Sequence, residues 1–158
     1  MHPGTGCKGD NDPLDVCEIG MVQLATGSVT PVKVLGVLAM IDDGETDWKI
    51  IAMSARDLWA AKINNIRDVE RHLPGTLHAI REWFRLYKTA DGKPENTFAL
   101  DELFMDRSYA QQIIADCNGS WKTLMSGDAA NGEASVAALT RDRRRSLLGD
   151  VAGQEPGP

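Results

Sequence analysis

Residues 32–53 read VKVLGVLAMIDDGETDWKIIAM, and this stretch decides the fold. An apolar segment rich in β-branched residues follows Pro31, and it predicts a buried strand that begins just after the proline. Asp43-Gly44 is a typical tight-turn pair, because glycine reaches positive φ without steric cost. The segment from Trp48 to Met53 predicts a returning strand. Together the two segments predict an antiparallel hairpin with acidic residues gathered at its turn.

The turn of this hairpin carries four carboxylates within six residues, followed by a lysine. These residues are Asp42, Asp43, Glu45, Asp47 and Lys49. Carboxylates can hold a divalent cation, and a lysine beside them can contact an anion that the cation has recruited. The cluster therefore indicates a site for a metal-bound polyanion such as a phosphate.

A second acidic cluster lies at residues 9–16, which read GDNDPLDV. Its three carboxylates, Asp10, Asp12 and Asp15, repel one another unless a cation lies between them. Pro13 pushes Asp12 towards an extended conformation, so the segment is not a helix interior. On a regular strand Asp10 and Asp12 would project from one face. Such oxygen ligands suit Mg²⁺, Mn²⁺ or Ca²⁺. The spacing alone leaves open both a divalent-metal site and a solvated acidic turn.

The composition limits the class of protein. With 158 residues, of which 42% are hydrophobic, the chain is predicted to form one globular domain. Its net charge of −6 argues against binding to duplex nucleic acid, which favours a basic face. No apolar window approaches the length of a membrane span, and the first residues are not an apolar signal core. We therefore expect a cytoplasmic protein that binds neither nucleic acid nor membrane.

The remaining chain is predicted to be mainly helical, after one early strand at 15–19. Apolar residues recur at helical spacing in three later segments, which are 65–73, 76–88 and 108–125. After Ser126 the chain is rich in glycine, alanine and charge, and 127–158 is predicted to be a flexible C-terminal tail. Residues 1–126 then form the predicted globular domain. The three cysteines lack C-x-x-C spacing and are predicted to be free thiols.

Two familiar acidic motifs do not fit the first cluster. An EF-hand loop that starts at Asp10 would need a ligand at its fifth position and a glycine at its sixth, where this chain has Leu14 and Asp15. The phosphoaspartate enzymes place their D-x-D motif directly after a long apolar strand, whereas Asp10 follows Cys7-Lys8-Gly9.

Three segments in order resemble the soluble inorganic pyrophosphatases. Residues 10–16 (DNDPLDV) resemble the family signature, and 42–49 resemble its second acidic block. Residues 83–88 (WFRLYK), followed by 91–96 (DGKPEN), resemble the eukaryotic-type branch. The resemblance covers residues 9–125 and implies that residues 1–126 form a pyrophosphatase-like catalytic domain. It implies an α+β fold in which a partial OB-like antiparallel β-barrel is flanked by two or three helices.

The resemblance also implies residue roles. Asp10, Asp15 and Asp47 would hold the tightest Mg²⁺, for which Mn²⁺ can substitute, and Asp42 with Asp47 would hold a further ion. Asp12 would orient or deprotonate the attacking water. The residues that contact pyrophosphate would be Lys49, Tyr87 and Lys88, with Lys49 and Tyr87 also counted as catalytic. From the residues alone, Tyr87 could equally be a packed helix aromatic and Lys88 a solvated charge.

Family members of this branch carry an N-terminal region that supplies early barrel strands and further active-site residues, and nothing before Asp10 matches it. We therefore expect metal binding with weak or absent turnover from this chain. Two functions are carried forward. One is Mg²⁺-dependent hydrolysis of pyrophosphate, and the other is a non-catalytic, pyrophosphatase-derived domain that binds metal or a partner. The resemblance further implies a homodimer.

Overall fold

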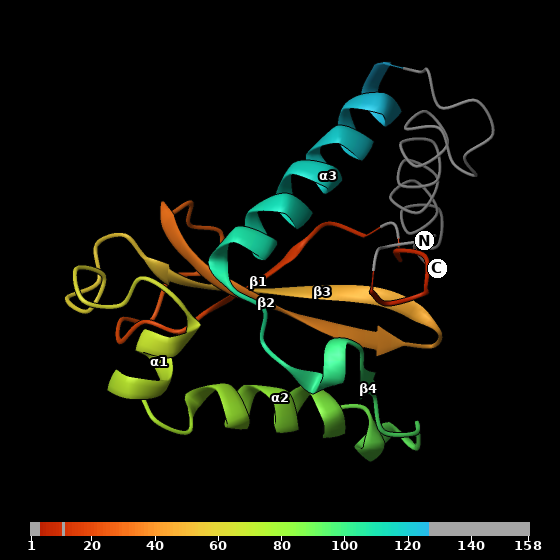
Figure 1. Ribbon diagram of the computed structural model, residues 1–158, viewed down its shortest axis with the longest axis horizontal. Coiled ribbons are helices and arrows are strands. Elements are labelled where there is room, and N and C mark those ends of the chain that lie inside the picture. The colour runs from red at the N-terminus through yellow and green to blue at the C-terminus, as the bar shows by residue number, and fades with distance from the viewer. Residues whose placement is uncertain (1–3, 11, 127–158) are drawn as a thin grey trace, which may run out of the picture. The chain divides into compact units, whose positions relative to one another are not determined.

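The computed structural model describes residues 4–10 and 12–126, and within them the fold is α+β, as predicted (Figure 1). The strands are β1 (Asp15–Glu18), β2 (Val32–Asp42), β3 (Glu45–Ser54) and β4 (Thr97–Phe98). The α-helices are α1 (Ile66–His72), α2 (Thr76–Leu86) and α3 (Arg107–Ser126), and two short 3-10 turns are η1 (Thr89–Asp91) and η2 (Leu100–Glu102). The chain divides into two units after Ile114, and the sheet belongs to the first. The predicted tail, 127–158, lies outside the described residues, so the division at residue 126 stays a prediction.

The predicted hairpin is present. Strands β2 and β3 pair antiparallel, with Asp42 opposite Glu45 at the turn. Asp43 and Gly44 both have positive φ, 48° and 86°. Positive φ at both central residues is what a two-residue hairpin turn with the right-handed twist of the strands requires. The Asp-Gly pair therefore identified the turn correctly.

Of the expected partial OB-like antiparallel β-barrel, the β2–β3 and β2–β4 pairs are antiparallel, whereas closure into a barrel is not seen among the described residues, which form a mixed sheet in the order β1-β3-β2-β4. Strand β1 runs parallel to β3, with Asp15 opposite Lys49. The reason is the order of the strands, since β1 lies beyond β3 and not beside β2, its successor in the chain. Strands β1 and β2 run in opposite directions, and so do β2 and β3, so β1 and β3 run the same way and pair in parallel. Strand β4 pairs antiparallel with β2 at the other edge.

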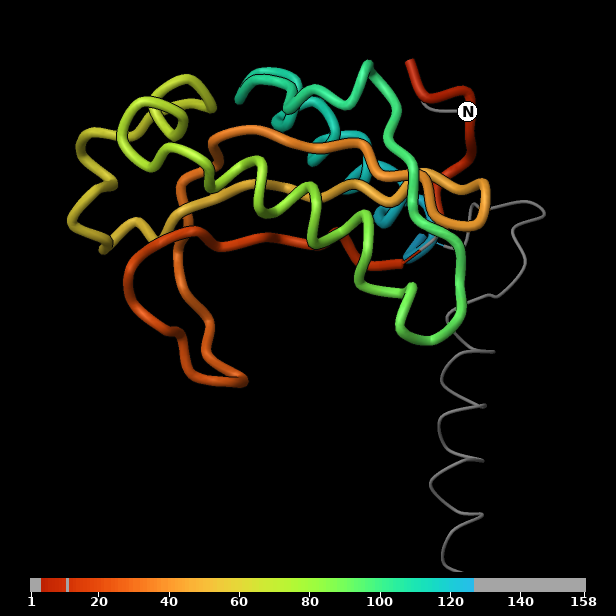
Figure 2. Tube along the Cα trace, turned by 90° about the horizontal axis from the view of Figure 1, so that it is seen from below, coloured from red at the N-terminus to blue at the C-terminus, as the bar shows by residue number. Residues whose placement is uncertain are grey.

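Helices α1 and α2 cover one face of the sheet, and Figure 2, viewed from that side, shows α2 crossing the strands. The core between them contains Leu35, Ile51 and Met53 from the strands and Val69 and Leu77 from the helices. On the other face, the ring of Tyr109 at the start of α3 lies 6.0 Å from that of Trp48. No helix among the described residues is long and apolar enough to cross a membrane.

The three predicted helices form close to their predicted bounds. Helix α1 begins after Asn65, whose side chain accepts a hydrogen bond from the backbone N–H of Asp68 at 3.0 Å and caps the helix. Helix α2 ends at Leu86, two residues before the predicted end. There the chain tightens into η1, which Gly92 closes with a φ of 77°.

We predict that Gly36→Ala lowers the free energy of unfolding by about 2 kcal/mol, because overpacking a well-filled core forces backbone shifts. A β-carbon at Gly36 would overlap Ile66 and the carbonyl oxygen of Met105. That carbonyl accepts the backbone N–H of Val37 at 3.1 Å, so it cannot simply move away. Urea denaturation measures the effect. The matched control is Gly119→Ala in α3, where a β-carbon meets nothing within 4 Å and should stabilise the helix by about 0.5–1 kcal/mol.

Candidate active site

The site starts from strand β3, which points Asp47 and Lys49 to the same face as Ile51, because alternate residues of a strand share a face. Ile51 belongs to the core under α1 and α2. Asp47 and Lys49 therefore continue this apolar row towards the turn. The parallel register brings Asp15 of β1 beside Lys49. The structure thus brings together two predicted metal ligands and one predicted phosphate ligand.

Lys49 holds its ammonium group between two carboxylates. Its Nζ lies 2.6 Å from Asp15 Oδ2 and 2.6 Å from Asp47 Oδ2, and its side chain is only 4% exposed. The ring of Phe84 lies 5.0 Å from the same nitrogen. Burial alone would lower the pKa of Lys49, but the hydrogen bonds to Asp15 and Asp47 outweigh burial and raise it. Lys49 is therefore a fully charged, buried cation.

The carboxylates around Lys49 carry more negative charge than one lysine neutralises. Burial raises the pKa of Asp47, and its hydrogen bond to Lys49 lowers it by less. The nearby charges of Asp10 and Asp15 raise it further. A raised pKa means that the ionised form of Asp47 is less stable here than in water. An additional cation nearby would stabilise that form.

Asp10 and Asp12 lie in a turn that reaches β3 from the N-terminal side, and not on a regular strand. Gly9 bridges to Thr46, whose backbone N–H donates to the carbonyl of Lys8 at 2.7 Å. The backbone N–H of Asp12 donates to Asp10 Oδ1 at 3.1 Å. Asp10 thereby fixes the turn and leaves the carboxylate of Asp12 exposed.

The remaining predicted residues meet at the other end of the hairpin turn. Lys88, just beyond α2, donates a hydrogen bond to the carboxylate of Asp42, and this bond raises the pKa of Lys88. Tyr87 stacks on Trp83, with ring centroids 5.0 Å apart and an interplanar angle of 16°. A hydrogen bond between Tyr87 and Lys88 also raises the pKa of Lys88. Tyr87 is thus both a packed aromatic and a neighbour of the predicted phosphate ligand.

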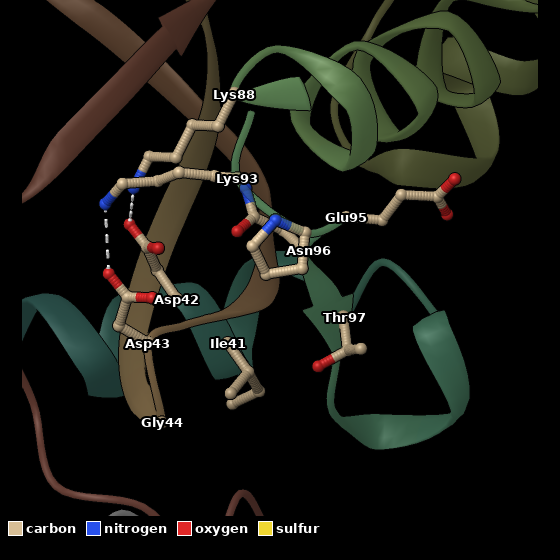
Figure 3. Close-up of a pocket in the computed structure, with 10 residues that line it drawn as sticks. Ile41, Asp42, Asp43, Gly44, Lys88, Lys93, Glu95, Asn96 and Thr97 are labelled. Atoms are coloured by element: carbon tan, nitrogen blue, oxygen red, sulfur yellow. Dashed lines mark hydrogen bonds and ion pairs between the residues drawn. The ribbon is translucent and has the colours of Figure 1, made fainter. Parts of the chain in front are cut away.

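A cavity of about 160 Å³ opens between the hairpin turn and the loop after α2 (Figure 3). Two ion pairs lie along it, Asp42 with Lys88 and Asp43 with Lys93, the latter at 3.3 Å. The opposite side is formed by residues 94–97. The cavity therefore has room for several water molecules.

The predicted metal ligands do not converge on one point. Among residues 4–10 and 12–126, no three carboxylate, histidine or cysteine groups come together closely enough to hold a metal ion. Asp15 and Asp47 bind Lys49 instead, and Asp42 binds Lys88. The predicted metal ligands and phosphate ligands therefore neutralise one another in this structure.

Sequence reasoning assigned no role to two residues that shape the site. Phe84 lies under Lys49, and Asn96 lines the cavity. Asn96 falls inside the motif at 91–96 that resembles the family, so its position in that motif was the one available signal. Its contacts depend on the fold and have no signature in the chain.

We predict that Cys17 resists alkylation at neutral pH. Burial raises the pKa of its thiol to about 11, so only about a thousandth of it is thiolate at pH 8. Because a raised pKa favours the protonated form, the rate with iodoacetamide in EDTA should rise about tenfold per pH unit up to about pH 11. Peptide mass spectrometry follows the reaction, and Cys17→Ser identifies the peptide. A rate that levels off below pH 9 would contradict the prediction.

Comparison with known proteins supports the resemblance. The family model described as inorganic pyrophosphatase matches residues 1–122. The inorganic pyrophosphatase of Yarrowia lipolytica is 56% identical over 131 residues, which are 83% of this chain and 46% of the relative. The chain spans about half the length of the curated relatives it matches.

Solved structures agree with the sequence comparison. The inorganic pyrophosphatase of Schistosoma japonicum superposes with a TM-score of 0.77 at 52% identity, over 78% of this chain and 44% of that one. An N-terminally truncated vacuolar soluble pyrophosphatase of Trypanosoma cruzi, solved in complex with PPi, has a TM-score of 0.75 at 47% identity, over 77% of this chain and 46% of that one. The family model alone spans more than half of the chain, and sequence and fold agree with it: the chain belongs to the inorganic pyrophosphatase family.

Proposed function

We propose that this chain supplies the acidic metal-binding and phosphate-binding part of a site for Mg²⁺-dependent hydrolysis of inorganic pyrophosphate to two phosphates. The observation that carries the proposal is the buried cation of Lys49 held between Asp15 and Asp47. The Asp42–Lys88 pair lies on the same face of the sheet as Lys49. Family membership and the PPi complex of the related trypanosomal protein support the choice of substrate.

The donor set fits Mg²⁺. The candidate ligands are carboxylates, which magnesium and manganese prefer. The ammonium group of Lys49 already occupies a position where two carboxylates bind a positive charge. We propose that Asp10, Asp15 and Asp47 hold the tightest ion, and that Asp42 and Asp47 hold a further one. Bound Mg²⁺ would lower the pKa of a water molecule and neutralise charge on the attacking and leaving oxygens.

The side chains of the site would activate the water molecule and bind the two phosphate groups. The exposed carboxylate of Asp12 orients the attacking water and accepts its proton as the water oxygen attacks phosphorus. The bond from that phosphorus to the bridging oxygen then breaks, without a phosphoenzyme. Lys49 and Lys88 exchange their carboxylate partners for phosphate oxygens, to which ammonium groups bind strongly. Tyr87 donates a hydrogen bond to the leaving phosphate, where negative charge develops.

The test is phosphate release from pyrophosphate by the purified chain, with Mg²⁺ and with EDTA. An Asp12→Asn preparation run alongside shows the background from any contaminating host enzyme. Release that needs both Mg²⁺ and Asp12 supports the proposal. A chain that binds Mn²⁺ in an electron paramagnetic resonance titration but releases no phosphate would instead support the non-catalytic metal-binding alternative.

A further inference from the structure

The end of helix α2 determines where Tyr87 and Lys88 lie, because these residues follow directly after its last residue, Leu86. The last four carbonyls of a helix have no partner within the helix. Unless something else binds them, the last turn frays, and the residues beyond it lose a fixed position. The partners of these carbonyls are therefore relevant to the site.

Asn96 binds two of these carbonyls. Its side-chain Nδ2 donates to the carbonyl of Phe84 at 2.9 Å, and its backbone N–H donates to that of Arg85 at 3.0 Å. The residue is only 6% exposed, so water cannot easily replace these bonds. Of the other two carbonyls, that of Leu86 accepts the hydroxyl of Thr89 at 2.7 Å, and that of Trp83 accepts the N–H of Tyr87 at 2.9 Å.

Asn96 is also tied to the strand that carries Asp42. It immediately precedes β4, in which Thr97 pairs with Ile41 of β2, the neighbour of Asp42. Figure 3 shows Asn96 beside the cavity where Lys88 reaches Asp42. One buried residue thus joins the end of α2 to the end of β2.

We propose that Asn96 is a positioning residue, which fixes Tyr87 and Lys88 against Asp42 so that they meet the same phosphate group. That Asn96 fixes these two residues is inferred from its hydrogen bonds. That the two residues then bind phosphate rests on the proposed function. A displacement of about 1 Å in a substrate-binding group can cost about a hundredfold in rate. A buried residue that holds this helix end in place would therefore increase the rate.

Another contact anchors the last turn of α2 through a side chain and binds none of its free carbonyls. Arg85 donates to both carboxylate oxygens of Glu102, at 2.6 and 3.3 Å. This paired bond acts through a side chain and keeps α2 in place when Asn96 is changed. Loss of the Asn96 side chain should therefore disturb the residues after Leu86 without detaching the helix.

The experiment compares Asn96→Ala with the unchanged chain. Asn96→Ser, whose side chain is too short to reach Phe84, serves as a second variant should alanine prevent folding. The control is Asn65→Ala, which removes the cap of α1 at a comparable cost in stability but lies away from the cavity. Isothermal titration with imidodiphosphate and Mg²⁺ measures binding. Fluorine NMR of 3-fluorotyrosine reports on the two tyrosines, Tyr87 and Tyr109.

We expect Asn96→Ala to weaken imidodiphosphate binding about tenfold or more and to shift or broaden the resonance of Tyr87 but not that of Tyr109. The Asn65→Ala control should change neither. An unchanged Tyr87 resonance in the Asn96 variants would overturn the inference, as would an equal change in the control. If the unchanged chain binds no imidodiphosphate, the proposed function fails, and the Tyr87 resonance still decides whether Asn96 positions this residue.

Discussion

Replacing Asp12 by asparagine should lower Mg²⁺-dependent phosphate release at least about a hundredfold, because general bases contribute about 10²–10⁴ to the rate. Mn²⁺ affinity and the free energy of unfolding should stay close to those of the unchanged chain. The combination is diagnostic, since most changes that abolish activity in a small domain also affect its stability.

The structure explains why stability should be spared. The carboxylate of Asp12 is exposed, and the turn depends on the Asp10 side chain, which accepts the backbone N–H of residue 12. Asparagine keeps that N–H and the size of the side chain, and it loses only the ability to accept a proton. Phosphate release, Mn²⁺ titration and urea denaturation measure the three quantities.

Asp91→Asn is the matched control for Asp12, because it makes the same change at another exposed aspartate. It should leave phosphate release unaltered. If the Asp12 variant keeps its rate, or if both variants lose it equally, Asp12 is not the group that activates water.

Replacing Lys49 by methionine should destabilise the metal-free chain by about 3 kcal/mol, because removing one partner of a buried ion pair leaves the other charge uncompensated. Asp47, only 16% exposed, would then face Asp15 without a cation between them. The same change should tighten Mn²⁺ binding about tenfold, because the ion no longer competes with the ammonium group. Mg²⁺ should therefore restore more stability to this variant than to the unchanged chain.

Thermal unfolding in EDTA and in Mg²⁺, with Mn²⁺ titration, tests this expectation. Lys33→Met provides the control, because Lys33 Nζ also makes two short hydrogen bonds, to Ala60 O and Asn64 Oδ1, but its acceptors are uncharged. It should lower stability without changing Mn²⁺ affinity. Weaker Mn²⁺ binding by the Lys49 variant would show that the ammonium group supports the metal site and does not occupy it.

Local chemistry made the hairpin and the helices predictable. Asp43-Gly44 specifies a turn with two positive φ values, and the structure has both. The three helices follow from apolar residues at helical spacing, and Asn65 caps the first of them. Helix α2 ends two residues before the predicted end, because Tyr87 continues the apolar spacing and has helical dihedral angles although it is already the C-cap.

The sheet order and the ion pairs could not be predicted, because both depend on which distant segments become neighbours. The sequence of residues 15–18 does not predict that this strand pairs with β3, or that the pairing is parallel. The contact of Lys49 with Asp15 follows from that pairing alone, since 34 residues separate them. The residue types of the site were readable from the chain, whereas the partners of those residues were not.

The parallel pairing of β1 with β3 also bears on the order of events during folding. The β2–β3 hairpin closes through a two-residue turn, and hairpins of this kind form within about 1–10 μs. Strand β1 pairs only after the chain has closed the much longer loop that separates Asp15 from Lys49, and closing such loops slows folding.

The apolar hairpin and its helices therefore have the shorter route to assembly, and Asp15 joins the other carboxylates of the proposed metal site in a later step. During that interval Lys49 has Asp47, its neighbour on β3, but lacks Asp15. On the proposed function, we expect divalent-ion binding to appear only after β1 has docked beside β3.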